Sequence, residues 1–152
     1  IVKGKKPREY SFMHGPGRKS ELDYYDGLYK RIEREQHLRN GIIFEGYTTT
    51  IASWYQNIGF ILSPSDFESF HFSIGEGVAS GAVPIIWPWE GATEIYPPSW
   101  VVKDTKDAAK RILNASQAAD LNADEDANRE YILNHFGTEV IFAELMKAMG
   151  LE

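Results

Sequence analysis

The sequence contains no cysteine, which excludes disulfide bonds and zinc sites built on thiolates. No apolar run in it approaches the roughly 20 residues that a membrane-spanning helix needs. The four histidines, at positions 14, 37, 71 and 135, do not show the spacing of metal ligands. We therefore expect a soluble protein of the cytoplasm that binds no metal ion.

Positive charge is missing from the middle of the chain. No lysine or arginine occurs between Arg39 and Lys103, although six acidic residues lie there. Residues 1–40 hold ten of the sixteen basic residues and only six of the twenty-two acidic ones. Because a nucleic-acid groove needs clustered cations, we expect no nucleic-acid partner.

The first residues have the pattern of a helix end. Residues 3–7, Lys-Gly-Lys-Lys-Pro, combine lysines, a glycine cap and a following proline, all typical of the last turn of a helix. A helix cannot consist of its end alone. We therefore expect the chain to be a piece of a longer one.

Short apolar segments alternate with helical patterns along the rest of the chain. We expect strands at residues 10–14, 42–47, 58–63, 83–87 and 100–102, and helices at residues 22–38, 51–55, 70–80, 91–96, 106–116, 124–136 and 138–149. This alternation predicts a parallel sheet covered by helices on both faces. The expected fold class is therefore α/β, with a doubly wound, Rossmann-like sheet in one domain spanning residues 1–152 and ligands bound beyond the carboxyl ends of the strands.

Two glutamates stand out in the segment from residue 64 to residue 86. Pro64-Ser65 precedes Glu68, seven residues separate Glu68 from Glu76, and a stretch with glycine and proline then leads into the next expected strand. This segment resembles the signature of glycosyltransferase family 4, which contains retaining enzymes of the GT-B fold. The resemblance extends to three further segments in the same order as in the family, namely His14-Gly15-Pro16-Gly17, Phe44-Glu45-Gly46-Tyr47 and Gly91-Ala92-Thr93-Glu94-Ile95.

The resemblance implies the C-terminal, donor-binding half of such an enzyme, with the first strand and most of the first helix of this domain absent. Glu68 would be the catalytic residue, in contact with hydroxyls of the transferred sugar, and Glu76 would hold the ribose diol of the nucleotide. The other substrate-binding residues that it implies are Ser69, Phe70, His71, Phe72, His14, Gly15 and Tyr47. The donor would be a nucleoside-diphosphate sugar, bound without a metal or other cofactor.

The resemblance also sets expectations for the parent protein. Its N-terminal domain would bind the acceptor, a glycan, a lipid or another molecule, so this chain alone would transfer no sugar. The parent would serve polysaccharide biosynthesis and could associate peripherally with a membrane.

The sequence departs from the family pattern in three places. The family usually has glycine where Ser69 and His71 stand, and smaller residues where Trp87-Pro88-Trp89 stands. It also has an arginine and a lysine facing the donor phosphates, in a region that this chain lacks. His71 is therefore either a phosphate donor or a polar residue at a helix start, and the two tryptophans either line a sugar site or pack in the core.

Other functions remain open from the sequence. A non-catalytic α/β module that binds a nucleotide or a partner is the main alternative. Gly15-Pro16-Gly17 is a poor match to a dinucleotide-binding loop, because serine occupies the third glycine position. Asp124-Glu125-Asp126 has the form of the metal-binding triplet of another glycosyltransferase fold, although favourable interaction with the helix dipole explains it better.

Overall fold

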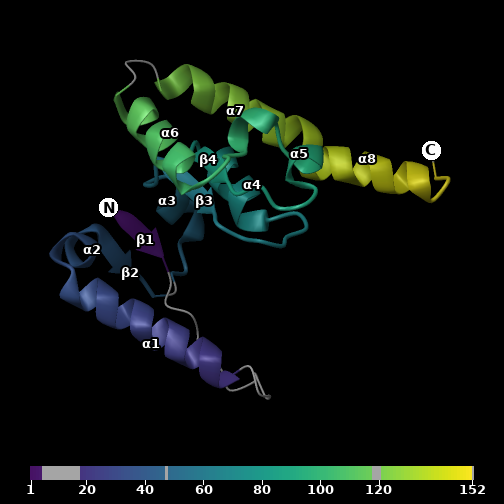
Figure 1. Ribbon diagram of the computed structural model, residues 1–152. Coiled ribbons are helices and arrows are strands. Elements are labelled where there is room, and N and C mark those ends of the chain that lie inside the picture. The colour runs from purple at the N-terminus through teal and green to yellow at the C-terminus, as the bar shows by residue number, and fades with distance from the viewer. Residues whose placement is uncertain (5–17, 47, 118–120, 152) are drawn as a thin grey trace. The chain divides into compact units, whose positions relative to one another are not determined.

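The computed structural model describes residues 1–4, 18–46, 48–117 and 121–151, which fall into two compact units, residues 1–49 and 50–152 (Figure 1). The expected strand at residues 10–14 lies outside the described residues, as do three of the expected substrate-binding residues, His14, Gly15 and Tyr47. Each unit is described by itself below.

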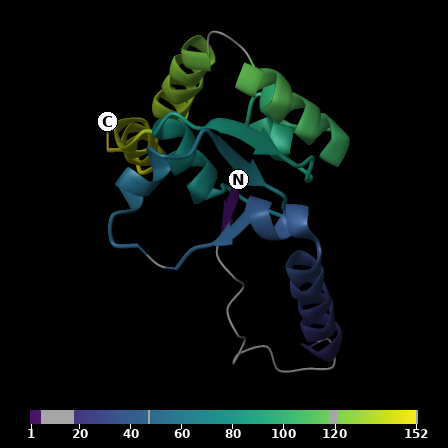
Figure 2. The same cartoon turned by 90° about the vertical axis from the view of Figure 1, so that its left-hand side faces the viewer.

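The first unit combines a pair of parallel strands with two helices. Strand β1 (Val2–Gly4) pairs with β2 (Ile42–Phe44), and helices α1 (Arg18–Arg34) and α2 (Gln36–Gly41) precede β2 in the chain. Figures 1 and 2 both show α1 as the long helix of this unit and α2 as the short one.

Two expectations for this unit are corrected. The start of the chain is not the end of a helix, because residues 2–4, which include the glycine taken as a helix cap, pair with the apolar residues Ile42–Phe44 as a strand. The helix expected at residues 22–38 is interrupted at Glu35, which has an extended backbone. The Glu35 carboxylate accepts a hydrogen bond from Arg31 Nε at 2.9 Å and lies 3.7 Å from Arg34, so local ion pairs gather at the break.

The second unit contains a second pair of parallel strands and six α-helices in its described part. Strand β3 (Phe60–Ser63) pairs with β4 (Val83–Ile86), with Phe60 opposite Val83. The helices are α3 (Ile51–Tyr55), α4 (Phe72–Ala79), α5 (Ala92–Ile95), α6 (Thr105–Gln117), α7 (Leu121–Phe136) and α8 (Thr138–Ala148). All of these helices were expected from the sequence, with small differences at their ends.

The strand expected at residues 100–102 is reduced to a single bridge. Val101 pairs in parallel with Ile86, and the Val102 amide donates to the Ile86 carbonyl at 2.8 Å. Pro98 begins a turn of 3-10 helix, Pro98–Trp100, which occupies the residues that would extend the strand. The chain is thus an α/β protein with parallel strands, and a single doubly wound sheet remains a prediction.

The buried core of the second unit forms where α4 packs on the strands and α7 packs on α4 (Figure 1). Its fully buried residues include Ile74 and Val78 of α4 and Ile86 of β4. A hydrogen bond links α7 to α4, because Arg129 Nε of α7 donates to the Ala79 carbonyl of α4 at 3.0 Å. In the part of the chain described here, no helix is both long enough and apolar enough to cross a membrane.

Candidate functional site

The strand, loop and helix expected around the two glutamates are confirmed. Strand β3 ends at Ser63, residues 64–71 form a loop that carries Glu68, and α4 carries Glu76. His71 has an extended backbone and precedes the first residue of α4 without capping the helix by its side chain. The carboxyl end of β3 and the N-terminus of α4 therefore bracket the loop that carries Glu68.

Four polar side chains gather at this loop, and we call them the Glu68 cluster: Ser63, Ser65, Glu68 and His71. Ser65 Oγ donates to Glu68 Oε1 at 2.9 Å, and the same oxygen lies 3.6 Å from His71 Nδ1. His71 Nδ1 also lies 2.9 Å from the hydroxyl of Ser63, which is fully buried at the end of β3. The contacts of this cluster therefore run through one oxygen of the carboxylate, Glu68 Oε1, and one ring nitrogen, His71 Nδ1.

Glu76 is held by a different partner. The hydroxyl of Tyr55, at the end of α3, donates to Glu76 Oε2 at 3.0 Å. Burial and then the hydrogen bond to Glu76 raise the pKa of Tyr55 to about 12, so the hydroxyl keeps its proton at neutral pH. Within the described residues, no hydrogen bond or ion pair joins Glu76 to the Glu68 cluster.

Tyr55 is a functional candidate that the sequence did not reveal. It lies 21 residues from Glu76 in the chain, and no local motif connects the two. They come together because Tyr55 is buried in the same apolar cluster as Ile74 and Val78 of α4. The one available sign was its position at the end of a short helix that leads toward β3.

The aromatic residues that flank His71 differ in their surroundings. Phe70 is half-buried and its ring lies 4.7 Å from that of Phe136 and 6.2 Å from that of Tyr96, centroid to centroid. Phe72 is 74% exposed, and Ser69 is exposed as well. The side chain of Phe70 is therefore a packing residue, whereas Ser69 and Phe72 remain open to a ligand.

The amides at the start of α4 are only partly available. The His71 N–H donates to the hydroxyl of Tyr96 at 3.3 Å, and burial raises the pKa of that hydroxyl. The Phe72 and Ser73 amides have no protein acceptor among the residues that the structure describes. These two N–H groups, rather than that of His71, can receive an anion at the helix N-terminus.

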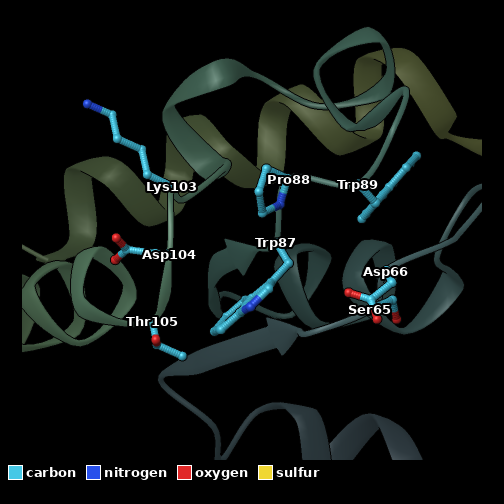
Figure 3. A pocket seen from close by; sticks show the side chains of 8 residues that line it. All are labelled: Ser65, Asp66, Trp87, Pro88, Trp89, Lys103, Asp104 and Thr105. Carbon is cyan, nitrogen blue, oxygen red and sulfur yellow. The ribbon is translucent and has the colours of Figure 1, made fainter.

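A cavity of about 300 Å³ opens beside the Glu68 cluster (Figure 3). It is lined by Ser65, Asp66, Trp87, Pro88, Trp89, Lys103, Asp104 and Thr105. Trp87 is half-buried beside the apolar cluster of Ile85 and Val102, and Trp89 is 7% exposed and belongs to the main core. The tryptophans therefore pack, which is one of the two alternatives that the sequence left open, and they also form walls of a cavity. That they line a sugar site stays a prediction.

The acidic triplet at residues 124–126 lies in the N-terminal part of α7, which begins at Leu121 rather than at the expected residue 124. Asp126 is exposed and lies 3.8 Å from Arg129 of the same helix. The described part of the chain contains no group of three or more histidine, aspartate or glutamate residues that could hold a metal ion.

Comparison with known proteins adds no family to this picture. No protein-family model matches the chain, and neither does any curated protein. The functional argument therefore depends on the residues themselves: one carboxylate held beside a histidine in a loop after a strand, and a second held by a tyrosine on the following helix.

Proposed function

We propose that the chain is the donor-binding domain of a retaining glycosyltransferase of the GT-B type, and that its strands belong to a doubly wound, Rossmann-like sheet. One observation carries the proposal. The loop after β3 and the helix that follows it present two oriented carboxylates, Glu68 and Glu76, near free amides at the start of α4. A ligand with both hydroxyls and phosphates matches these groups.

Each group has a role in donor binding. The amides of Phe72 and Ser73 receive a phosphate oxygen of the donor, with help from the helix dipole. Glu76 uses Oε2 for the Tyr55 hydroxyl and keeps Oε1 for the ribose diol. Glu68 uses Oε1 for Ser65 and keeps Oε2 for a hydroxyl of the transferred sugar. Carboxylates are suited to this task because they only accept hydrogen bonds, and hydroxyls donate them.

The proposal has two corollaries. Donor binding needs no divalent metal, so a chelator should leave nucleotide affinity unchanged. The isolated chain transfers no sugar, because the acceptor side of a GT-B cleft belongs to the other domain, and closure of that cleft aligns the reactants.

The test separates the two glutamates by calorimetric titration. Nucleoside diphosphates and nucleoside-diphosphate sugars are first screened by thermal shift to find the base, and the best pair is then titrated. Glu76→Ala should weaken both ligands about 10- to 100-fold, the effect of one hydrogen bond to a charged group. Glu68→Ala should weaken only the ligand that carries a sugar. Glu144→Ala, at an exposed position of α8, is the matched control and should change neither.

Equal effects of the two substitutions on both ligands would contradict the assigned roles. The absence of any nucleotide that stabilises the protein would favour the alternative, a non-catalytic module that binds a protein partner. The lack of any lysine or arginine from residue 40 to residue 102 is the observation that favours this alternative, because phosphate sites commonly use such side chains.

A further inference from the structure

The cavity beside the Glu68 cluster is built from three separate segments of the chain. Ser65 and Asp66 follow β3, residues 87–89 follow β4, and residues 103–105 follow the bridge at Val101. The first two segments lie just after the carboxyl ends of parallel strands and the third just after a parallel bridge, and open α/β sheets bind ligands at such an edge. Figure 3 shows Trp87 between Asp66 on one side and Thr105 on the other.

The apolar part of the cavity consists of tryptophans that pack against buried residues. Trp87 packs against the buried cluster of Ile85 and Val102, and Trp89 lies edge-on against Tyr96 with ring centroids 6.5 Å apart. Large aromatic side chains that are fixed in this way offer a flat apolar surface at little conformational cost. The apolar C–H face of a sugar ring matches such a surface.

The polar part of the cavity consists mainly of hydrogen-bond acceptors. Asp104 uses Oδ1 to cap α6, through the amides of Lys106 and Asp107. The carboxylate of Asp66 is exposed and has no protein partner among the described residues, and it lies beside the walls formed by the tryptophans (Figure 3). The hydroxyl of Thr105 adds a group that can donate or accept.

The charge of the cavity disfavours anions. Two carboxylates line it against one ammonium, and the Lys103 side chain extends away from the other lining residues in Figure 3. A phosphate or a carboxylate would meet Asp66 and Asp104, whereas a neutral ligand rich in hydroxyls would supply a hydrogen-bond donor to the carboxylate of Asp66.

We propose that this cavity binds one ring of a neutral sugar, which rests on Trp87 and donates a hydroxyl to Asp66. Its volume of about 300 Å³ is at the lower end for small-molecule sites, as expected for a single ring. Ser65 lines the cavity while its hydroxyl donates to Glu68, so the ring lies next to the Glu68 cluster. The cavity adjoins the proposed donor site through Ser65, but its ligand carries no phosphate, so the two sites can be tested separately. If both exist, the cavity takes a sugar of the acceptor or of the growing product.

Saturation-transfer NMR on the full chain tests the proposal without any nucleotide. The probes are the methyl glycosides of glucose, galactose and mannose, with methyl glucuronide as the anionic counterpart. At least one neutral glycoside should bind, and the glucuronide should bind more weakly. Asp66→Ala should weaken the neutral glycoside about 10-fold, the effect expected from loss of one hydrogen bond to a charged group. Asp126→Asn, at an exposed site on α7, is the control and should have no effect.

Three further variants keep the test decisive. Asp66→Asn should reduce the difference in affinity between the neutral glycoside and methyl glucuronide, because it removes one of the two carboxylates that line the cavity. Trp87→Ala should abolish saturation transfer, and Trp87→Phe should retain part of it while keeping the packing against Val102.

The proposal is overturned if no neutral glycoside binds, if binding survives both Asp66→Ala and Trp87→Ala, or if uridine or adenosine competes better than any sugar. These results are independent of the donor site, because its test uses Glu76→Ala and nucleoside diphosphates. A negative result for one proposed site therefore does not contradict the other.

Discussion

The hydroxyl of the buried residue Tyr55 orients the surface carboxylate of Glu76. Only 6% of its surface is exposed, and its proton is directed at Glu76 Oε2. A ligand that approaches Glu76 therefore meets a carboxylate with one oxygen already occupied and with its orientation fixed. Fixed orientation lowers the entropy that binding must remove from the side chain.

The Tyr55 hydroxyl should make the folded state sensitive to alkali. Its pKa rises from 10.0 to about 12 in the folded protein, so below pH 10 both states keep the proton and the stabilisation is fully present. Between pH 10 and pH 12 the unfolded chain releases the proton while the folded one still holds much of it, so stability falls as pH rises, by up to roughly 2 kcal/mol.

Chemical denaturation at a series of pH values measures this effect. Tyr55→Phe should be less stable than the wild type at pH 8 by about 1 kcal/mol, for the lost hydrogen bond, and should lose less stability from pH 10 to pH 12. Tyr24→Phe, on an exposed part of α1, is the control. A wild type and a Tyr55→Phe variant with parallel pH profiles would contradict the assignment.

At the scale of elements, the packing of α4 on β3 depends on Gly77. A Cβ atom there would lie 2.6 Å from Ile61 Cδ1 and 3.2 Å from Ile61 Cβ, so both a flexible end and a fixed branch point stand in its way. Because Ile61 is itself in the core, the helix could accept a larger residue only by moving away from the strand.

Gly77→Ala should therefore destabilise the protein by about 1–3 kcal/mol through overpacking. Adding Ile61→Val removes the nearest methyl group and should return part of that loss, which a double-mutant cycle measures as a coupling energy. Gly59→Ala is the matched control, since nothing lies within 4 Å of its added Cβ. If Gly77→Ala unfolded thermally at the same temperature as the wild type, α4 would not be held as close to Ile61 of β3 as the structure has it.

The comparison of sequence and structure is clearest for single elements. The helix at residues 51–55 and the strands at residues 60–63 and 83–86 agree with the expected patterns, because periodicity and apolar runs report local structure. The break at Glu35 and the single bridge at Val101 were not predicted, since they depend on side-chain pairing and on the turn at Pro98.

The same distinction, between features set by neighbouring residues and contacts between distant segments, applies to the candidate site. The loop position of Glu68 and the helical position of Glu76 could be predicted, because each depends on its own neighbours in the chain. The contact from Tyr55 to Glu76, the Tyr96 hydroxyl on the His71 amide and the cavity walls all join distant segments. Spacing in a sequence does not carry such information.

At the scale of the whole molecule, apolar burial is unevenly divided. Every buried apolar residue in the described part of the chain lies in the unit from residue 50 to residue 152. All four tryptophans also lie there. Unfolding followed by tryptophan emission therefore reports on this unit, which contains the positions of the Tyr55 and Gly77 substitutions.

The stretch without lysine or arginine has a consequence for how binding responds to ionic strength. Anion sites built on cationic side chains weaken as electrolyte is added, because screening removes the attraction. Here the amides at the start of α4 stand near Glu68 and Glu76, and electrolyte screens the repulsion of a diphosphate instead. Nucleoside diphosphate affinity should stay constant or rise between about 20 mM and about 200 mM sodium chloride, where the Debye length falls below about 10 Å. Calorimetry across this range checks the sign, and a steep fall in affinity would mean that cations from elsewhere in the chain reach the phosphates.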